Sequence, residues 1–178
     1  MRNTLGQVQE RALVRPAPDG TMPAAVAPTI KEIPYDYVAT FTLQGRAGNR
    51  VQDVINISTD GAFVAVSIGY SFIPARFDPY TLPDQRVIDF KYSVIDSGSG
   101  RELQNKPIHN IAGLGEPNGN RPFRPFAKPM LFMPRSTIRI EIEEILEDLN
   151  QQTPFYNGAQ LFIVFHGYKM LGYGTGLP

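Results

Sequence analysis

Cysteine and tryptophan are both absent from the 178-residue chain, and histidine occurs only twice. Without a thiol the chain can form neither a disulfide nor a thiolate metal site, and it has no cysteine nucleophile. The 17 basic and 17 acidic side chains cancel to a net charge of zero. Because this removes the long-range positive field of a nucleic-acid-binding protein, nucleic acid is an unexpected partner.

Long hydrophobic runs are missing as well. No segment approaches the roughly 20 consecutive apolar residues that cross a membrane. Residues 1–15 lack the apolar stretch of a secretory signal. We therefore expect a soluble protein that is made in the cytoplasm and has no membrane partner.

Aromatic residues are absent from the first 34 positions, which contain five prolines. A segment without large apolar side chains cannot offset the entropy that it loses when it becomes ordered. Residues 1–34 are therefore predicted to form an extended N-terminal arm that becomes ordered on the surface of a partner. Arg15 and Ile30 are its predicted contact residues. The alternative is a disordered tail without a role.

Residues 35–172 have the pattern of a β-sheet domain. Apolar and polar side chains alternate with a period of two, as in strands with one buried face, at residues 35–43, 50–58, 86–96 and 138–146. Residues 63–73 and 160–168 are almost continuously apolar, which is typical of central strands. The pattern predicts an all-β fold, an antiparallel, jelly-roll-like β-sandwich, followed by an irregular C-terminal tail at 173–178.

Two further expectations concern residues 160–168 and residues 108–120. Residues 160–168 are expected to pair either with the central strand at 63–73 or with the strand at 138–146. Residues 108–120 are rich in glycine and are expected to form a flexible loop.

Residues 121–136 form a stiff ribbon that is rich in proline, phenylalanine and basic residues. Its prolines remove backbone donors and fix the φ angle, so we expect the ribbon at the edge of a sheet. Arginine and aromatic side chains are enriched at the energetic centres of protein interfaces. The ribbon is therefore predicted to contact another protein, although the same mixture can stack on nucleic acid bases. The predicted contact residues are Arg121, Phe123, Arg124, Phe126 and Phe132.

Catalytic chemistry has few candidates. His166 lies between Phe165 and Gly167 and is expected to be a packed or hydrogen-bonded strand residue. The acidic residues between 141 and 148 are expected to form the solvated face of a strand rather than a pair of glycosidase carboxylates. The glycine-rich loop lacks the dinucleotide-binding spacing, and no EF-hand pattern is present. We therefore expect a protein that is not an enzyme and that uses no cofactor and no metal ion.

Four segments resemble the small β-sandwich virion proteins of tailed bacteriophages. They read VINISTDGAFVAVSIGYSF (residues 54–72), RELQNKPI (101–108), RPFRPFAKPMLFMPRSTIRIEIEE (121–144) and LFIVFHGYKMLG (161–172). In those proteins a proline-rich segment precedes a late strand, and a short Gly-Tyr-Lys sequence ends the domain. The resemblance covers about residues 35 to 172.

This resemblance implies a structural role in the virion, without catalytic residues. The function that it implies is that of a capsid decoration, or cement, protein: a homo-oligomer that binds the major capsid protein and stabilises the assembled head in the host cytoplasm. A ring component of the neck or collar at the head-tail junction is the alternative within the same class. A carbohydrate- or receptor-binding jelly roll is the alternative from another class, with stacking residues Tyr70, Tyr80, Tyr156 and Tyr173.

Overall fold

A computed structural model of the chain describes residues 30–76, 88–117, 121–149 and 154–173. These residues form nine strands and one short helix. The elements are β1 (Lys31–Thr42), β2 (Arg50–Asn56), β3 (Gly61–Ile73), β4 (Phe90–Asp96), β5 (Arg101–Glu102), β6 (Ile108–His109), α1 (Asn110–Gly113), β7 (Phe123–Phe132), β8 (Thr137–Glu144) and β9 (Gln160–Leu171). In this part of the chain, no helix has the length and apolarity needed to cross a bilayer.

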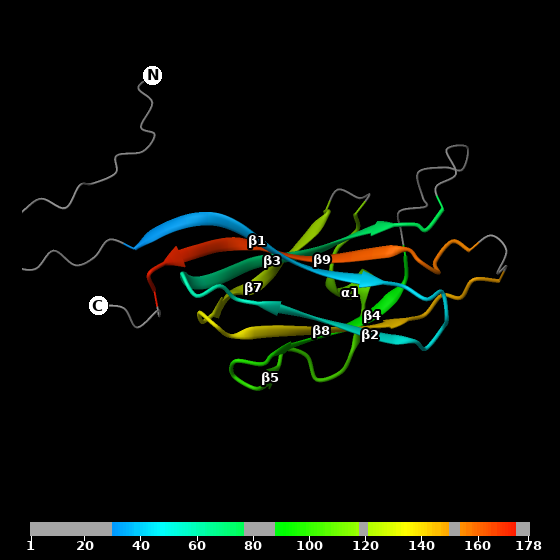
Figure 1. Cartoon of the computed structure of the whole chain (residues 1–178), viewed down its shortest axis with the longest axis horizontal. Helices are drawn as coiled ribbons and strands as arrows, with labels where there is room; N and C mark the ends of the chain where they lie inside the picture. Colours follow the sequence, from blue (N-terminus) through cyan, green and yellow to red (C-terminus); the bar gives the residue numbers. More distant parts are fainter. Residues whose placement is uncertain (1–29, 77–87, 118–120, 150–153, 174–178) are drawn as a thin grey trace, which may run out of the picture.

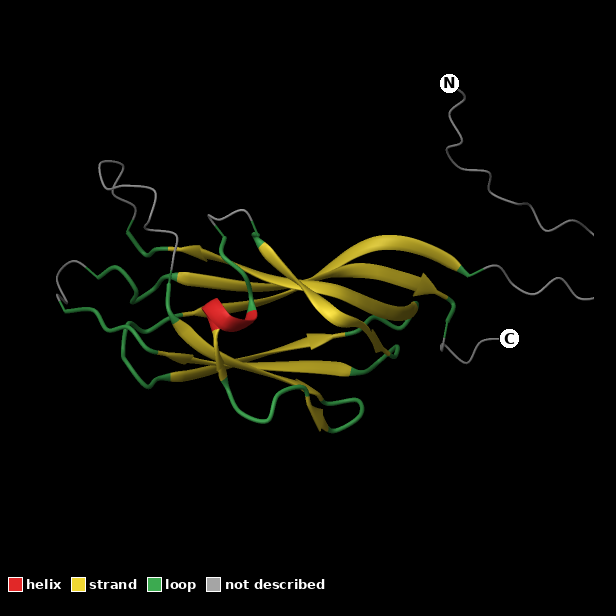
Figure 2. Ribbon diagram, turned by 180° about the vertical axis from the view of Figure 1, so that it is seen from behind, coloured by secondary structure: helices red, strands yellow, loops and turns green. Residues whose placement is uncertain are grey.

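The strands form two sheets that pack face to face (Figure 1, Figure 2). One sheet has the strand order β1-β9-β3-β7. The other has the order β2-β8-β4-β5, and β6 pairs with β4. Neighbouring strands run antiparallel in both sheets.

The strand pairs are nested within one another. The first long strand pairs with the last, β1 with β9; inside this pair lie β2 with β8, β3 with β7 and β4 with β5. Two further pairings, β3 with β9 and β4 with β8, roll the nested ribbon into two sheets. This is the topology of a jelly roll, so the predicted antiparallel β-sandwich is confirmed.

The core lies between the sheets and follows the alternation in the sequence. In β8, Ile138, Ile140 and Ile142 are fully buried, whereas Arg139 between them is exposed. The same alternation buries every second residue of β4, namely Phe90, Tyr92 and Val94. Each such side chain stabilises the fold by about 1.5–3 kcal/mol relative to an exposed one. Strands β3 and β9 lie inside their sheet, as their nearly continuous apolar sequences predicted.

The boundary between arm and domain differs from the prediction. Strand β1 begins at Lys31 rather than at Tyr35, so residues 31–34 belong to the sheet. Pro34 is tolerated because β1 is an edge strand, where a missing backbone donor leaves no gap in the ladder. Residues 1–29, including Arg15, and residues 174–178 lie outside the described residues.

The structure also answers two other expectations, the partner of residues 160–168 and the loop at residues 108–120. Strand β9 pairs with β1 and β3, so the central strand is its partner and β8 is not. Helix α1 lies where a flexible loop was expected, because its first residue, Asn110, is anchored in the core. The Asn110 amide donates to the Ile88 carbonyl at 2.6 Å and accepts from the Phe90 N–H at 3.1 Å.

Candidate functional site

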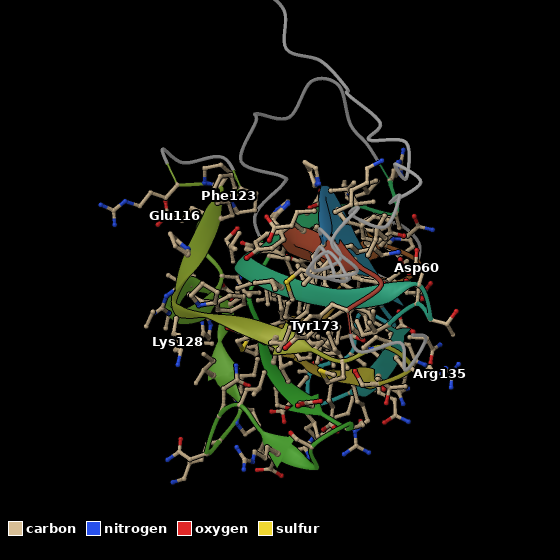
Figure 3. The ribbon with its side chains drawn as sticks, turned by 90° about the vertical axis from the view of Figure 1, so that its left-hand side faces the viewer. Asp60, Glu116, Phe123, Lys128, Arg135 and Tyr173 are labelled. Atoms are coloured by element: carbon tan, nitrogen blue, oxygen red, sulfur yellow. The ribbon has the colours of Figure 1, made fainter. Side chains whose placement is uncertain are left out.

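Strand β7, which holds most of the predicted contact residues, is the outermost strand of its sheet, as its prolines indicated. Its pairing with β3 is interrupted: Pro125 lies opposite Ser67, and Met130 lies opposite Ala65. The extra residues of β7 between these two pairs leave the ladder as a bulge, and Lys128 lies at the bend of the strand (Figure 3). The alternation of β7 continues across the bulge, so Phe123 and Leu131 lie on one side of the strand and Phe132 on the other.

The predicted phenylalanines therefore separate. Phe123 is 47% exposed, whereas Phe132 is only 3% exposed. The Phe132 ring packs against the rings of Phe63 and Phe165, so this residue belongs to the core, and its assignment to a surface contact is corrected. Phe126 is half-buried, with its ring 6.2 Å from that of Phe165. Of the three, Phe123 alone presents a largely exposed ring.

The basic and arm residues of the prediction lie at the surface or outside the described part of the chain. Arg121 and Arg124 are both exposed. Ile30, the first described residue, lies just before β1 and is 44% exposed. Arg15, the other predicted contact residue of the arm, lies outside the described residues. These residues and Phe123 do not form one cluster with the buried Phe132.

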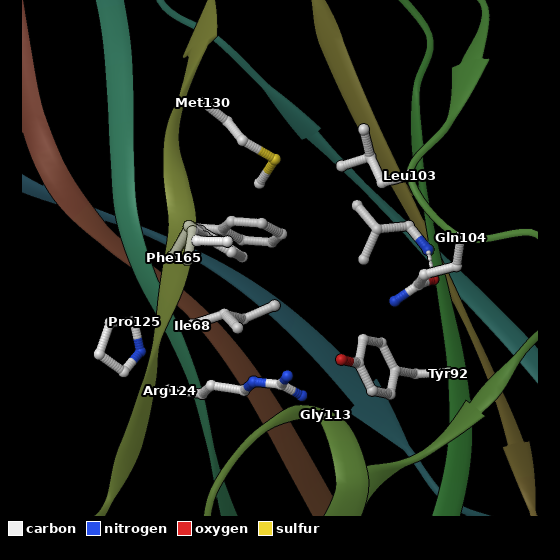
Figure 4. A pocket seen from close by; sticks show the side chains of 12 residues that line it. Ile68, Tyr92, Leu103, Gln104, Gly113, Arg124, Pro125, Met130 and Phe165 are labelled. Atoms are coloured by element: carbon white, nitrogen blue, oxygen red, sulfur yellow. Dashed lines mark hydrogen bonds between the residues drawn. The ribbon is translucent and has the colours of Figure 1, made fainter.

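A cavity of about 330 Å³ lies behind β7, between the two sheets (Figure 4). Its apolar lining includes core side chains of both sheets: Ile68, Val94, Phe126, Met130 and Phe165. At one end Arg124 lies beside Tyr92 (Figure 4). Burial, partly offset by the Arg124 charge, raises the pKa of Tyr92 to about 12, so its hydroxyl stays protonated. The cavity thus has room for an apolar group and a cation near it.

The outer face of the β1-β9-β3-β7 sheet is largely apolar, and we call it the apolar face. One row across its four strands joins Val38, Val164, Gly69 and Phe123. A second row joins Pro34, Tyr168, Val64 and Leu131. Val38 is 48% exposed and Leu131 is 46% exposed. These two residues lie on the two edge strands, and the half-buried Val164 and Tyr168 of β9 lie between them. A continuous exposed apolar surface of this kind is typical of a protein contact.

One polar pair lies within the apolar face. The carboxylate of Asp36 lies 3.1 Å from Nδ1 of His166 on the neighbouring strand. The His166 ring is also 5.4 Å from the Phe123 ring. His166 is therefore a half-buried, hydrogen-bonded strand residue, as expected from the sequence.

The outer face of the opposite sheet is different, because it carries ion pairs. Glu143 of β8 binds Arg50 at 2.7 Å and Lys91 at 2.9 Å. The hydrogen bond from Lys91, followed by that from Arg50, outweighs desolvation and lowers the pKa of Glu143. Glu141, on the same side of β8, lies 3.7 Å from Arg50. This sheet presents the solvated, charged face that the acidic pattern predicted.

Two acidic residues of the same segment have a different role. Glu144 is only 4% exposed and accepts hydrogen bonds from the backbone N–H groups of Gln44 and Gly45. Asp148 accepts from the backbone N–H groups of Tyr156 and Asn157 and so holds the loop before β9. Glu144 and Asp148 therefore hold loops in place and are not part of the solvated, charged face.

No known protein family and no curated protein sequence matches this chain. One solved structure, a chain from Desmodium yellow mottle tymovirus, is similar over 85% of this chain and 93% of that chain, with 11% identity and a TM-score of 0.30. This TM-score is too low to establish a shared fold. The jelly-roll assignment depends on the strand pairing alone.

The three described tyrosines of the sugar-stacking alternative do not form an exposed platform. Tyr70 is 5% exposed, and its hydroxyl accepts a hydrogen bond from Asn110 inside the core. Tyr156 is half-buried against Phe72, and Tyr173 is 39% exposed at the end of β9. Tyr80 lies outside the described residues. Within the described ranges, no group of three or more histidine, aspartate and glutamate side chains is placed to hold a metal ion.

Val38 and Asp36 of the edge strand β1 lie on the apolar face but were not among the contact residues predicted from the sequence. Val38 falls in the alternating segment 35–43, on the side opposite the core residues Tyr37 and Ala39. A usable signal was present in β9, whose two faces are both apolar: Ile163 and Phe165 on one side, Phe162 and Val164 on the other. A strand of this kind needs cover on both faces, and here only one face has it.

Proposed function

We propose that this chain is a non-enzymatic structural protein of a virion, and more finely a capsid decoration protein that binds the assembled head of a tailed bacteriophage. The observation that carries the proposal is the contrast between the two outer faces of the jelly roll. One face exposes Val38, Phe123 and Leu131, whereas the other is covered by ion pairs around Glu143. Such a subunit has one face suited to protein contact and one suited to solvent.

The contrast between the faces explains how a small subunit can reinforce a large particle. Each contact made by a single subunit is modest, but subunits that also contact their neighbours gain from contacts already formed. A neutral chain adds no long-range repulsion between copies crowded on one shell. The sequence resemblance to β-sandwich virion proteins supports the same assignment.

The neck or collar component stays the alternative within this class, because a ring uses the same kind of contact. The sugar-binding alternative has less support, since the burial of Tyr70 removes one of its four stacking residues. A jelly roll by itself does not choose among these functions.

The test is to add the purified full chain to phage heads that lack it and to measure its copy number on the heads by quantitative mass spectrometry. Saturable binding at hundreds of copies supports a decoration protein, and about a dozen copies restricted to one vertex supports the neck reading. A chain that binds no head or neck component, but binds a glycan saturably, contradicts the proposal.

A further inference from the structure

We infer that the apolar face of the β1-β9-β3-β7 sheet binds the same face of a second copy of this chain, around a two-fold axis that runs along the strands. The inference rests on the proposed function, because it names the first partner of the proposed contact surface. Its support comes from the area of the face, its charge and the order of large and small side chains across it.

The area is sufficient for a stable pair. Four strands spaced about 4.8 Å apart, each contributing about nine residues at 3.3 Å per residue, cover roughly 600 Å². Two such faces bury about 1,200 Å² in total, which is the lower end of the range for specific protein complexes. Flat sheet faces are also able to pack on one another with aligned strands, as the two sheets of a sandwich do.

Charge favours a copy of the same chain as the partner and selects the direction of the axis. The chain has a net charge of zero, so two copies do not repel each other at a distance. An axis along the strands keeps each cross-strand row in register but reverses the strand order, so that Asp36 of one copy faces Pro125 of the other. An axis across the strands at this row would instead place the two Asp36 carboxylates together, which is unfavourable.

Side-chain size fits the same axis. The β7 edge of the apolar face carries the large side chains Phe123 and Leu131, and the β1 edge carries the smaller Val38 and Pro34 in the same two rows. Reversal of the strand order places Phe123 over Val38 of the partner copy and Leu131 over its Pro34. Gly69 sits beside Phe123 in the row, where an added Cβ would lie 3.1 Å from the Phe123 Cβ. The face is therefore shaped to be covered by its own reversed copy.

The chain offers a matched pair of substitutions. Val38→Lys places a charge on the apolar face, at a side chain that is 48% exposed. Val54→Lys makes the same change on the outer face of the opposite sheet, at a valine that is 44% exposed. Both positions lie in strands, so any cost in β propensity is shared.

The experiment is sedimentation equilibrium of the full chain and the two variants over a wide concentration range, with circular dichroism to verify folding. We expect a dimer for the wild type and for Val54→Lys, and a dissociation constant raised about tenfold or more for Val38→Lys. Phe123→Ala, which removes an exposed ring without adding charge, should weaken the dimer in the same direction.

Three results would overturn the inference: a wild-type chain that stays monomeric, a Val38→Lys dimer as stable as the wild-type dimer, or equal weakening by Val54→Lys. These results differ from failure of the proposed function. A folded dimer with no affinity for phage heads would remove the function and leave the two-fold contact, whereas a monomer that decorates heads would do the reverse.

Discussion

The buried carboxylate of Glu144 accepts several hydrogen bonds from one loop. Its carboxylate is 4% exposed and accepts from Gln44, Gly45 and the Asn49 side chain, at distances between 2.6 and 2.9 Å. These bonds tie the β1–β2 connection to the end of β8. If the buried carboxylate is removed, its donors are left without an acceptor, and each unpaired buried donor lowers the stability of the fold.

Substitution of this carboxylate should be costly. Glu144→Gln turns one acceptor into a donor that faces backbone N–H groups, so the free energy of unfolding should fall by about 2–4 kcal/mol. Urea unfolding measures this change. Glu141→Gln, on the solvated face of the same strand, is the control and should cost less than about 0.5 kcal/mol. Equal effects at the two positions would mean that the Glu144 contacts contribute no stability.

Asp148 predicts how stability depends on pH. Burial acts to raise its pKa, but the N–H groups of Tyr156, Asn157 and Phe155 together outweigh it, so the pKa of Asp148 is lowered. A lowered folded-state pKa gives stability that is present above the unfolded pKa of about 3.9 and is lost as the pH falls through the folded value. The wild type should therefore be more stable than Asp148→Asn at neutral pH, and the two should converge in acid. Urea unfolding at several pH values tests this, and a constant difference between the two proteins would contradict it.

At the scale of the element, β7 separates stability from assembly along one strand. Phe132→Ala should lower the free energy of unfolding by about 3–5 kcal/mol, because it opens a cavity beside Phe63 and Phe165. Phe123→Ala should cost less than about 1 kcal/mol, because the ring is 47% exposed, while it weakens self-association. Paired measurements of unfolding and sedimentation test both. If Phe123→Ala unfolds as easily as Phe132→Ala, the ring is part of the core.

Strand β7 also shows which features could be predicted from the sequence and which depend on strand pairing. Alternation was sufficient to predict β8 and the edge position of β7, because both depend on local periodicity and on proline. Alternation also places Phe123 and Phe132 on opposite faces, because an odd number of positions separates them. It could not predict which of the two faces the core, since that depends on the pairing of β7 with β3. Pairing between distant strands also creates the apolar face, in which Val38 and Phe123 share a row across β9 and β3.

At the scale of the whole molecule, the domain boundary at Lys31 predicts how the chain tolerates truncation. Removal of residues 1–29 should leave the unfolding transition nearly unchanged. It should weaken binding to phage heads, because the arm is expected to contact them. Removal of residues 1–34 also deletes the pairing of Ile33 with Lys169. It should lower the free energy of unfolding by a further amount of about 1–3 kcal/mol. Thermal unfolding and head-binding assays measure the two effects. Equal stability of the two truncations would contradict the position of β1.

The central claim is that the apolar face is where this jelly roll meets other proteins. A cryo-electron microscopy reconstruction of a head bound by the full chain tests it most directly, because it shows which sheet is covered. The account predicts that Val38, Phe123 and Leu131 are buried in a contact and that the ion pairs around Glu143 remain in solvent. A particle in which the charged face is covered and the apolar face is open would contradict the claim.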